Sequence, residues 1–512
     1  MSDGPRLGLL EGFRAHARHR GQTTALTDHR ASYSFAELWD ASSRFAARLR
    51  AAGIGPGGTV GVAMGGSAAH VAALLGTMLA GAASAPINIA LTPSEVGRYL
   101  DILDPRLVVA DPDGLAHLPS TTEVTEVDSA ASSVPLAARL GAEGTEPFTG
   151  GLDRPSEAPA LLFPTGGTTG LPKAAVLSHR ATLLWALSMA GHGRAGQGTE
   201  LYVLPFFHVG LMTGLLSTLH AGGPVIIQAR FDPDRACDHI LRDHASRLQV
   251  VPTHMRRMRE SPSFAQARAW IRDVRFGGMS SAPEFVDELL EMLPNARIST
   301  SYGATEFGPV TKLAHDDLVA GRRTGVGRPV PCVNVTIQRP DGTGADPGEA
   351  GDVVVSCPWS ASGYVGRPEE TAATFLPRGV RLADVGALDD EGWLTLLGRR
   401  SDMVVTGGEN VFPAEIESVL VTHPDIAEVV VYGVPDETWG QRVEAAVVAR
   451  PGAAPTTGSV REFGRARLAP YKLPRSVRLL DRIPLTSTNK PDRRTLQAAS
   501  ADLQVPAPAP QP

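Results

Sequence analysis

Short apolar runs alternate with longer, helix-like segments between about residues 30 and 330 of this chain. Strand-like runs include residues 160–163, 201–204 and 248–251, and apolar residues recur with helical spacing from 286 to 293. Strands and helices in alternation favour stacked α/β layers with largely parallel sheets, in which ligands bind at the carboxyl ends of the strands. We therefore predict an α/β fold of this kind for the first part of the chain.

The pattern changes beyond residue 330. Residues 333–338 and 352–356 are typical of antiparallel strands, and the turn-forming sequence Arg-Pro-Asp-Gly lies between them at 339–342. These segments predict a small β-rich subdomain. A further hairpin-like segment, 393–398, leads into a charged stretch at 399–402.

We place the main domain boundary at this charged stretch. A chain of 512 residues is long enough for more than one core, because single cores stop growing near about 250–300 residues. We expect a large N-terminal domain over residues 1–398 and a small α+β C-terminal domain over residues 403–504. The proline-rich end, residues 505–512, is typical of a disordered tail.

Charge and composition exclude several classes of partner. The formal net charge is -6, with both signs scattered along the chain, so neither a nucleic-acid footprint nor a polybasic membrane patch is expected. The apolar stretch 71–91 is broken by Pro86 and Asn88, which predicts a buried helix followed by a strand and no membrane insertion. The first residues lack a secretory pattern, so a cytoplasmic location is expected.

A glycine- and threonine-rich segment follows the predicted strand at 160–163. It consists of Thr165, Gly166, Gly167, Thr168, Thr169 and Gly170, with Lys173 shortly after. Glycine N–H groups, threonine hydroxyls and a lysine charge can together hold a polyphosphate. The segment is not a Walker A loop, because Leu171 and Pro172 separate the last glycine from the lysine. A plain surface turn is the alternative interpretation.

This loop is one of several segments that, taken in order, resemble the adenylate-forming superfamily of acyl-CoA synthetases, carrier-protein adenylation domains and luciferases. The resemblance covers nearly the whole chain, and the order of the pieces makes it specific. The matching segments are 33–38, 165–173, 204–210, 277–279, 301–306, 383–386, 398–399, 407–410 and 489–490. The resemblance, which is strongest to bacterial acyl-CoA ligases, implies an AMP-forming acid–thiol ligase that uses ATP, Mg²⁺ and coenzyme A.

The resemblance also implies which residues bind the nucleotide. Tyr302 stacks on adenine, Asp384 and Arg399 contact the ribose, Thr305 donates to the α-phosphate, and Glu306 holds Mg²⁺. Without the resemblance, these would be interpreted as a core tyrosine, an ion pair and a solvated acid. The full set implied for ATP or AMP is Thr165, Gly166, Gly167, Thr168, Thr169, Gly170, Lys173, Gly278, Met279, Ser301, Tyr302, Gly303, Asp384 and Arg399.

The family carries out two half-reactions at one site, and the resemblance implies the same here. Lys490, which would otherwise be interpreted as a solvated lysine, bridges the carboxylate and the α-phosphate during adenylation. The C-terminal domain then rotates about a hinge in residues 399–402, which maps to Ser401. Rotation replaces the lysine with a glycine loop that admits the pantetheine arm, and the residues implied to bind coenzyme A are Gly407, Gly408, Tyr471 and Lys472.

The acyl pocket is implied by motif position. It comprises Phe206, Phe207, His208, Gly277, Gly303 and Ala304. Amino-acid-activating relatives carry an aspartate after the aromatic residue, whereas this chain has His208, so a proteinogenic amino acid is disfavoured. The small residues at 303 and 304 permit a bulky or extended apolar acid. His208 is either a catalytic residue or a structural histidine.

Several departures from the family pattern fall on the adenylation half. Pro164, Gly166 and Ala174 alter the phosphate loop, and Asn489 and Pro491 flank the catalytic lysine. One alternative is therefore a ligase that adenylates weakly and converts a supplied acyl-adenylate to the thioester.

Two further alternatives concern the acceptor and catalysis itself. The acceptor thiol belongs to coenzyme A or to the phosphopantetheine of an acyl carrier protein, since both present the same arm. A protein that binds a nucleotide or adenylate without catalysis is the alternative from another class.

Overall fold

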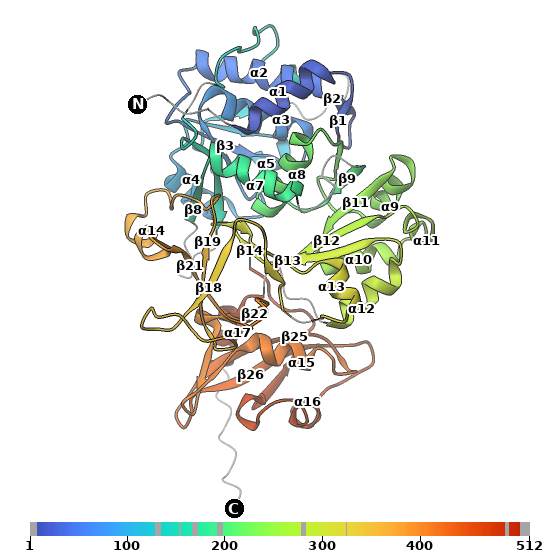
Figure 1. Ribbon diagram of the computed structural model, residues 1–512, viewed down its shortest axis with the longest axis vertical. Coiled ribbons are helices and arrows are strands. Elements are labelled where there is room, and N and C mark those ends of the chain that lie inside the picture. The colour runs from blue at the N-terminus through green and yellow to red at the C-terminus, as the bar shows by residue number, and fades with distance from the viewer. Residues whose placement is uncertain are drawn as a thin grey trace, which may run out of the picture. The chain divides into compact units, whose positions relative to one another are not determined.

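A computed structural model describes residues 8–127, 135–152, 155–165, 173–191, 198–277, 283–323, 325–486 and 491–501 of the chain (Figure 1). By their internal contacts the residues divide into two compact units. The first consists of Met1–Val335 and Val354–Arg381, and the second of Thr336–Val353 and Leu382–Pro512. Each unit is described separately below.

Two sheets form the framework of the first unit. The seven-stranded sheet has the order β13 (Arg297–Ser301), β12 (Asp273–Gly277), β11 (Ala245–Val250), β9 (Thr199–Tyr202), β10 (Val225–Ile227), β1 (Thr24–Thr27) and β2 (Ser32–Ser34). Every neighbouring pair in it is parallel except the last. The six-stranded sheet has the order β6 (Val124–Glu126), β5 (Leu107–Ala110), β3 (Thr59–Ala63), β4 (Ala83–Pro86), β7 (Pro159–Thr165) and β8 (Lys173–Ser178). The predicted α/β fold with largely parallel sheets is confirmed.

The helices of the first unit fill the space around these sheets. One core cluster contains side chains from both sheets and from α1, α2, α3, α7 and α8. Helix α2 begins at a capping box, in which the Ser34 hydroxyl accepts from the Glu37 N–H and the Glu37 carboxylate accepts from the Ser34 N–H. The helices are α1 (Leu9–His19), α2 (Phe35–Ala51), α3 (Ala68–Ala80), α4 (Pro93–Leu103), α5 (Pro112–Leu115), α6 (Leu136–Arg139), α7 (His179–Gly191), α8 (Val209–His220), α9 (Pro233–Arg242), α10 (Pro252–Arg259), α11 (Phe264–Ala267), α12 (Pro283–Met292), α13 (His315–Val319) and α14 (Pro368–Thr374).

The apolar stretch at 71–91 forms a buried helix followed by a strand, as predicted. Every residue of α3 is buried, and the chain then turns at Gly81 into β4. Among the described residues, no helix has both the length and the apolar character that a membrane crossing requires.

Antiparallel pairs are frequent beyond residue 330. One five-stranded sheet has the order β18 (Asn334–Gln338), β19 (Gly351–Ser356), β21 (Gly379–Leu388) and β20 (Phe375–Leu376), with β22 (Leu394–Arg399) against β21. The other has the order β24 (Glu409–Val411), β23 (Val404–Thr406), β26 (Gly440–Ala449) and β25 (Ile426–Asp436), with β27 (Ser476–Leu479) against β26. Helices α15 (Pro413–Leu420) and α17 (Arg493–Ala501) pack on β25, and α16 (Thr457–Arg465) packs on α15.

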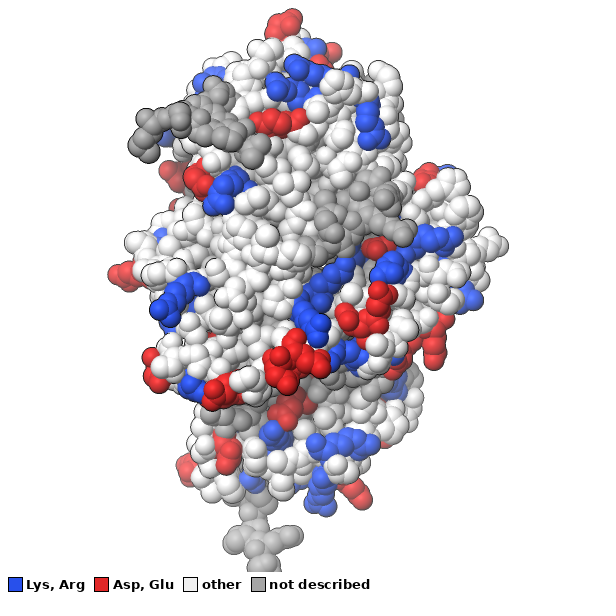
Figure 2. Space-filling model, in the orientation of Figure 1, with Lys and Arg blue, Asp and Glu red and all other residues white. Residues whose placement is uncertain are grey.

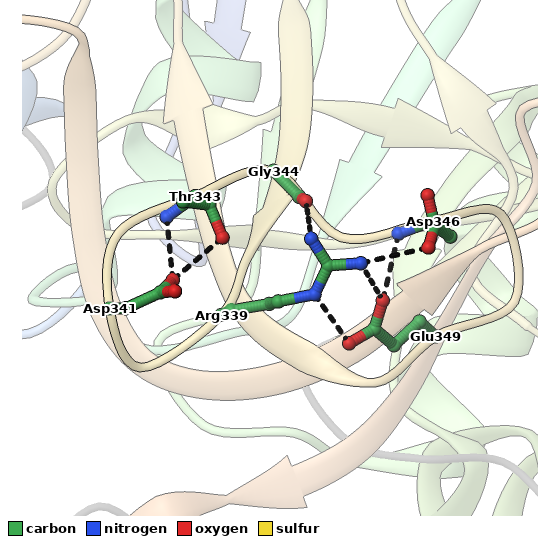
Figure 3. A network of polar contacts seen from close by, with 6 residues as sticks. All are labelled: Arg339, Asp341, Thr343, Gly344, Asp346 and Glu349. Atoms are coloured by element: carbon green, nitrogen blue, oxygen red, sulfur yellow. Dashed lines mark hydrogen bonds and ion pairs between the residues drawn. The ribbon is translucent and has the colours of Figure 1, made fainter.

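Charged side chains of both signs lie close to one another on the face that Figure 2 shows. A well-defined group of such charges occupies the loop between β18 and β19 (Figure 3). There the guanidinium of Arg339 contacts Asp346 and Glu349, with an Nε–Oε1 distance of 2.8 Å to Glu349. The predicted turn at 339–342 is confirmed, since the Gly342 N–H donates to the Arg339 carbonyl over 2.9 Å.

Candidate functional site

The carboxyl ends of the seven-stranded parallel sheet bring several predicted residues to one edge. Gly277 ends β12, Ser301 ends β13, and these two residues are direct partners in the parallel register. Phe206, Phe207 and His208 follow β9 in the same sheet and lead into α8. Since parallel strands present their carboxyl ends at a common edge, the predicted acyl-pocket residues gather where such a sheet binds ligands.

The aromatic part of the predicted pocket is largely buried. Phe206 is 3% exposed and Phe207 is 9% exposed. The His208 ring lies 4.5 Å from the Phe207 ring, centroid to centroid, and His208 is the residue that precedes the first turn of α8. This environment is compatible with both interpretations of His208, catalytic and structural.

A short hairpin carries the predicted nucleotide motif. Its strands are β14 (Gly303–Ala304) and β15 (Gly308–Pro309), and Thr305 and Glu306 lie in its turn. A Cβ atom on Gly303 would lie 2.4 Å from the Gly308 carbonyl oxygen. This close approach alone requires glycine at 303, so Gly303 gives no independent information on the size of the acyl group.

Tyr302 precedes this hairpin and is half-buried. Its ring lies 6.0 Å from that of Phe307 in an edge-on arrangement, and its carbonyl accepts from the Val310 N–H over 2.8 Å. The hairpin therefore fixes the backbone of Tyr302.

Glu306 joins this hairpin to the end of the phosphate loop. Its Oε1 accepts a hydrogen bond from the Thr165 hydroxyl over 3.1 Å, although the two residues are 141 positions apart. The same oxygen accepts from the Tyr364 hydroxyl over 2.7 Å. The side chain is buried, at 4% exposure. Two motifs that the sequence placed far apart are thus in direct contact.

The contacts of Glu306 fit a divalent cation. In the described part of the chain its carboxylate receives hydroxyl hydrogen bonds and forms no ion pair, although a buried charge is costly unless it is compensated. Within the same residues, no cluster of three or more His, Cys, Asp or Glu side chains could hold a metal. A cation at Glu306 would therefore need further oxygen ligands, and Mg²⁺ usually takes these from substrate phosphates and water.

Tyr364 was not predicted from the sequence. It lies in a segment that pairs with β8, where the Val176 N–H donates to the Gly363 carbonyl over 2.9 Å. Burial, followed by the nearby Glu306 carboxylate, raises the pKa of the Tyr364 phenol, so the hydroxyl stays protonated and donates. The local sequence predicts at most a strand, and no signal in it points to Glu306.

The strands that flank the phosphate loop are paired at its base. Thr165 and Lys173 are direct partners across β7 and β8. Ala174, one of the departures from the family pattern, is fully buried in a core cluster with Tyr99 and Leu162. Its methyl group therefore packs in the core. The predicted residues that lie outside the described part of the chain are Gly166, Gly167, Thr168, Thr169, Gly170, Gly278, Met279 and Lys490.

In the second unit, Asp384 and Arg399 are direct partners across the antiparallel pair of β21 and β22. The Arg399 Nε lies 3.4 Å from the Asp384 Oδ1. The structure thus brings together the two residues predicted to contact a ribose. The ion pair also matches the plain structural interpretation of each residue.

Gly407 and Gly408 form a two-residue turn between β23 and β24. Their φ angles are 60° and 86°, the left-handed region that a tight hairpin turn requires at both positions. A Cβ on Gly407 would lie 2.9 Å from the Trp439 ring, whereas one on Gly408 would meet no atom within 4 Å. Backbone conformation accounts for both glycines, and the open space at Gly408 leaves room for a ligand.

The remaining predicted residues of the second unit lie in short turns. Tyr471 is 41% exposed, and the Lys472 ammonium pairs with Glu415 of α15, at an Nζ–Oε1 distance of 2.6 Å. The Ser401 hydroxyl donates to Asp402 over 3.0 Å within the turn Arg400–Asp402. Lys472 is therefore already neutralised by a neighbouring carboxylate.

Known protein families match most of this chain. The family described as AMP-binding enzyme matches residues 13–365, and the AMP-binding enzyme C-terminal domain matches residues 415–490. The 2-succinylbenzoate–CoA ligase of Geobacillus kaustophilus (strain HTA426) is 33% identical over 92% of this chain and 94% of that protein. The fatty acid–[acyl-carrier-protein] ligase ScoC of Streptomyces coeruleorubidus is 30% identical over 96% of each chain. The solved o-succinylbenzoate CoA synthetase of Bacillus subtilis, in complex with its acyl-adenylate intermediate, has a TM-score of 0.84 at 27% identity, over 95% of this chain and 97% of that one.

Proposed function

Since this chain belongs to the AMP-binding enzyme family and is an AMP-forming acid–thiol ligase, we propose that it converts a bulky or extended apolar carboxylic acid to its coenzyme A thioester. The observation that carries the proposal is the contact of Glu306 with Thr165. It joins the phosphate loop to the motif of residues 302–306, as a site for ATP and Mg²⁺ requires. The reaction passes through an acyl-adenylate.

In the first half-reaction a carboxylate oxygen of the acid attacks the α-phosphorus of ATP, and the bond to pyrophosphate breaks. Lys490 bridges the carboxylate and the α-phosphate, and Thr305 donates to an α-phosphate oxygen. Glu306 would hold Mg²⁺, which when bound would supply neutralisation of the charge that develops on the pyrophosphate. Positioning and charge account for most of the rate gain in such a step.

In the second half-reaction the thiol sulfur attacks the acyl carbon, and AMP leaves. We place the pantetheine arm beside the Gly407–Gly408 turn, after a rotation about Ser401 that withdraws Lys490. The open space beside Gly408 supports this proposal. Asp384 and Arg399 hold the ribose in this account, and their pairing supports a shared role.

The acid is proposed to be apolar and bulky or extended. The buried aromatic pair Phe206 and Phe207 supports an apolar acyl group. His208 stands where amino-acid-activating relatives carry an aspartate, so the pocket lacks that partner for an ammonium group. The acids named for the two similar ligases, 2-succinylbenzoate and a fatty acid, differ in shape. Aromatic acids and fatty acids are therefore the two classes of acid to test first.

The alternative of weak adenylation has less support than the sequence suggested. Ala174 packs in the core, so the alternative now depends on Pro164, Gly166, Asn489 and Pro491. The choice of acceptor also stays a proposal. Coenzyme A is favoured by the 2-succinylbenzoate ligase and a carrier protein by ScoC.

A two-part assay tests the proposal. Aromatic and aliphatic acids are offered with ATP and Mg²⁺, and pyrophosphate release is measured. The matching synthetic acyl-adenylates are offered with coenzyme A or a phosphopantetheinylated carrier protein, and the thioester is measured by mass spectrometry. The proposal predicts both activities. Thioester formation without pyrophosphate release from any free acid would leave only the weak-adenylation alternative.

Two variants separate the half-reactions. Lys490→Ala should lower pyrophosphate release by about 100-fold or more, since it removes a charge that acts on the transition state, and should spare thioester formation from the adenylate. Gly408→Trp should do the reverse, because it fills the space proposed for pantetheine. Full thioester formation from the free acid by the double variant would show that both residues are wrongly assigned.

A further inference from the structure

One tyrosine contacts two residues, Glu306 and Lys173, that the sequence motifs assign to the phosphates of ATP and their cation. The Tyr364 hydroxyl lies 2.7 Å from the Glu306 Oε1, and the Lys173 Nζ lies 4.9 Å from the centroid of the Tyr364 ring. A cation within about 6 Å of an aromatic face is attracted by it. Tyr364 is 7% exposed, so both contacts form away from bulk water.

The two hydrogen bonds to Glu306 determine which oxygen of its carboxylate is left for a ligand. The Tyr364 and Thr165 hydroxyls both donate to the Glu306 carboxylate. Both bonds end on Oε1. The described residues therefore fix the carboxylate through one oxygen and leave lone pairs on the other oxygen for a cation.

Tyr364 is itself held by the strand that begins at Lys173. Tyr364 forms an antiparallel bridge with Ala175 of β8. Its N–H donates to the Thr371 hydroxyl over 3.0 Å, and its ring packs edge-on against Phe375 at 5.3 Å. The phenol is thus placed by backbone pairing, with little freedom to follow a displaced Glu306.

Lys173 contacts a second residue besides Tyr364. Its ammonium forms an ion pair with Glu370 of α14, whose side chain is 36% exposed. The lysine therefore lies between an aromatic face and a partly exposed carboxylate, at the base of the phosphate loop.

We propose that Tyr364 is a positioning residue that fixes the Glu306 carboxylate for a divalent cation bound with the nucleotide, while its ring supports the Lys173 ammonium. This inference rests on the proposed function. Loss of the hydroxyl alone affects the cation, because the ring that supports Lys173 remains.

Binding of Mn²⁺ tests the inference without any acid substrate. Mn²⁺ is titrated by electron paramagnetic resonance into the full chain with α,β-methylene-ATP, which cannot release pyrophosphate. Tyr364→Phe should weaken Mn²⁺ binding by about 10- to 100-fold, the usual effect of removing a group that orients a metal ligand. Its affinity for the nucleotide in EDTA should match that of the wild type.

Tyr432→Phe is the matched control. Tyr432 is also buried, and its hydroxyl is 3.0 Å from that of Ser500 in the second unit. This variant loses a buried phenol hydrogen bond of similar length and should keep wild-type Mn²⁺ affinity. Melting temperatures of both variants separate loss of fold from loss of metal.

Replacement of Tyr364 by p-aminophenylalanine restores a donor to Glu306 and should return most of the lost affinity. A folded Tyr364→Phe chain with wild-type Mn²⁺ affinity would overturn the inference, as would an amino variant as weak as the phenylalanine one. If the wild type binds nucleotide but no Mn²⁺, the proposed role of Glu306 fails and the inference with it. If Tyr364→Phe binds Mn²⁺ as tightly as the wild type does, the role of Tyr364 is rejected and that of Glu306 is not.

Discussion

Glu306 and Glu349 each accept hydrogen bonds from more than one donor, and the two glutamates differ in the charge of those donors. Glu349 faces the Arg339 guanidinium in the exposed loop between β18 and β19 (Figure 3), and it also accepts from the Asp346 N–H over 2.9 Å. Glu306 is buried and accepts from two neutral hydroxyls. The first carboxylate is neutralised by its own loop, and the second lacks a cation among the described residues.

We propose that this difference separates a structural network from a binding site. A guanidinium and a carboxylate that pair neutralise each other, so the Arg339 loop requires no ligand. Glu306, held by hydroxyls, has no such partner among the described residues, and we propose that a divalent cation supplies it. The three predictions that follow test this contrast.

The largest difference should come from paired amide substitutions. Glu306→Gln keeps the shape of the side chain and removes the charge, so pyrophosphate release should fall by about 100- to 1000-fold, as for loss of a transition-state charge partner. Glu349→Gln should leave the rate unchanged. Steady-state rates with one active acid measure both, and a Glu306→Gln chain with wild-type pyrophosphate release would end the assignment of Glu306.

The glycines of the two loops should respond differently to a methyl group. Gly303→Ala places a Cβ 2.4 Å from the Gly308 carbonyl oxygen, and such overpacking should lower the free energy of unfolding by about 1–3 kcal/mol. Gly344→Ala in the Arg339 loop meets no atom within 4 Å and should change it by less than about 0.5 kcal/mol. Urea denaturation measures both. Equal effects would show that the hairpin holding Glu306 is not tightly packed.

The smallest effect is a pH dependence in the exposed loop. Hydrogen bonding to Arg339 lowers the pKa of Glu349 from its ordinary value of 4.5. A lowered folded-state pKa stabilises the fold fully above pH 4.5, and the contribution is lost as the pH falls through the folded-state pKa. Arg339→Gln should therefore be slightly less stable than the wild type at neutral pH. The two stabilities should converge in acid, and a difference that grows with falling pH would contradict this origin.

The sequence predicted residues for the candidate site and did not predict the contacts between them. Thr165 and Glu306 were both predicted, because each lies in a motif whose chemistry can be argued locally. Their hydrogen bond depends on how β7 and the hairpin of β14 and β15 meet, which no local pattern encodes. Tyr364 was missed for the same reason, since its contact with Glu306 arises from pairing with β8.

Local conformation was predictable where one residue type determines it. The helix–strand unit at 71–91 and the turn at 339–342 follow from apolar content and from turn-forming residues. The core position of Ala174 did not follow, because the residue looks like a change in the phosphate loop until its strand is placed in the sheet. Sequence motifs identify chemical groups, whereas packing decides which face each group presents.

Calorimetric titration with α,β-methylene-ATP, with Mg²⁺ and with EDTA, tests without any acid whether Glu306 holds the metal. Mg²⁺ should tighten nucleotide binding to the wild type, and Glu306→Gln should abolish this gain while it keeps the affinity measured in EDTA. Equal dependence on Mg²⁺ in the wild type and in Glu306→Gln would contradict the claim that this buried carboxylate holds the metal.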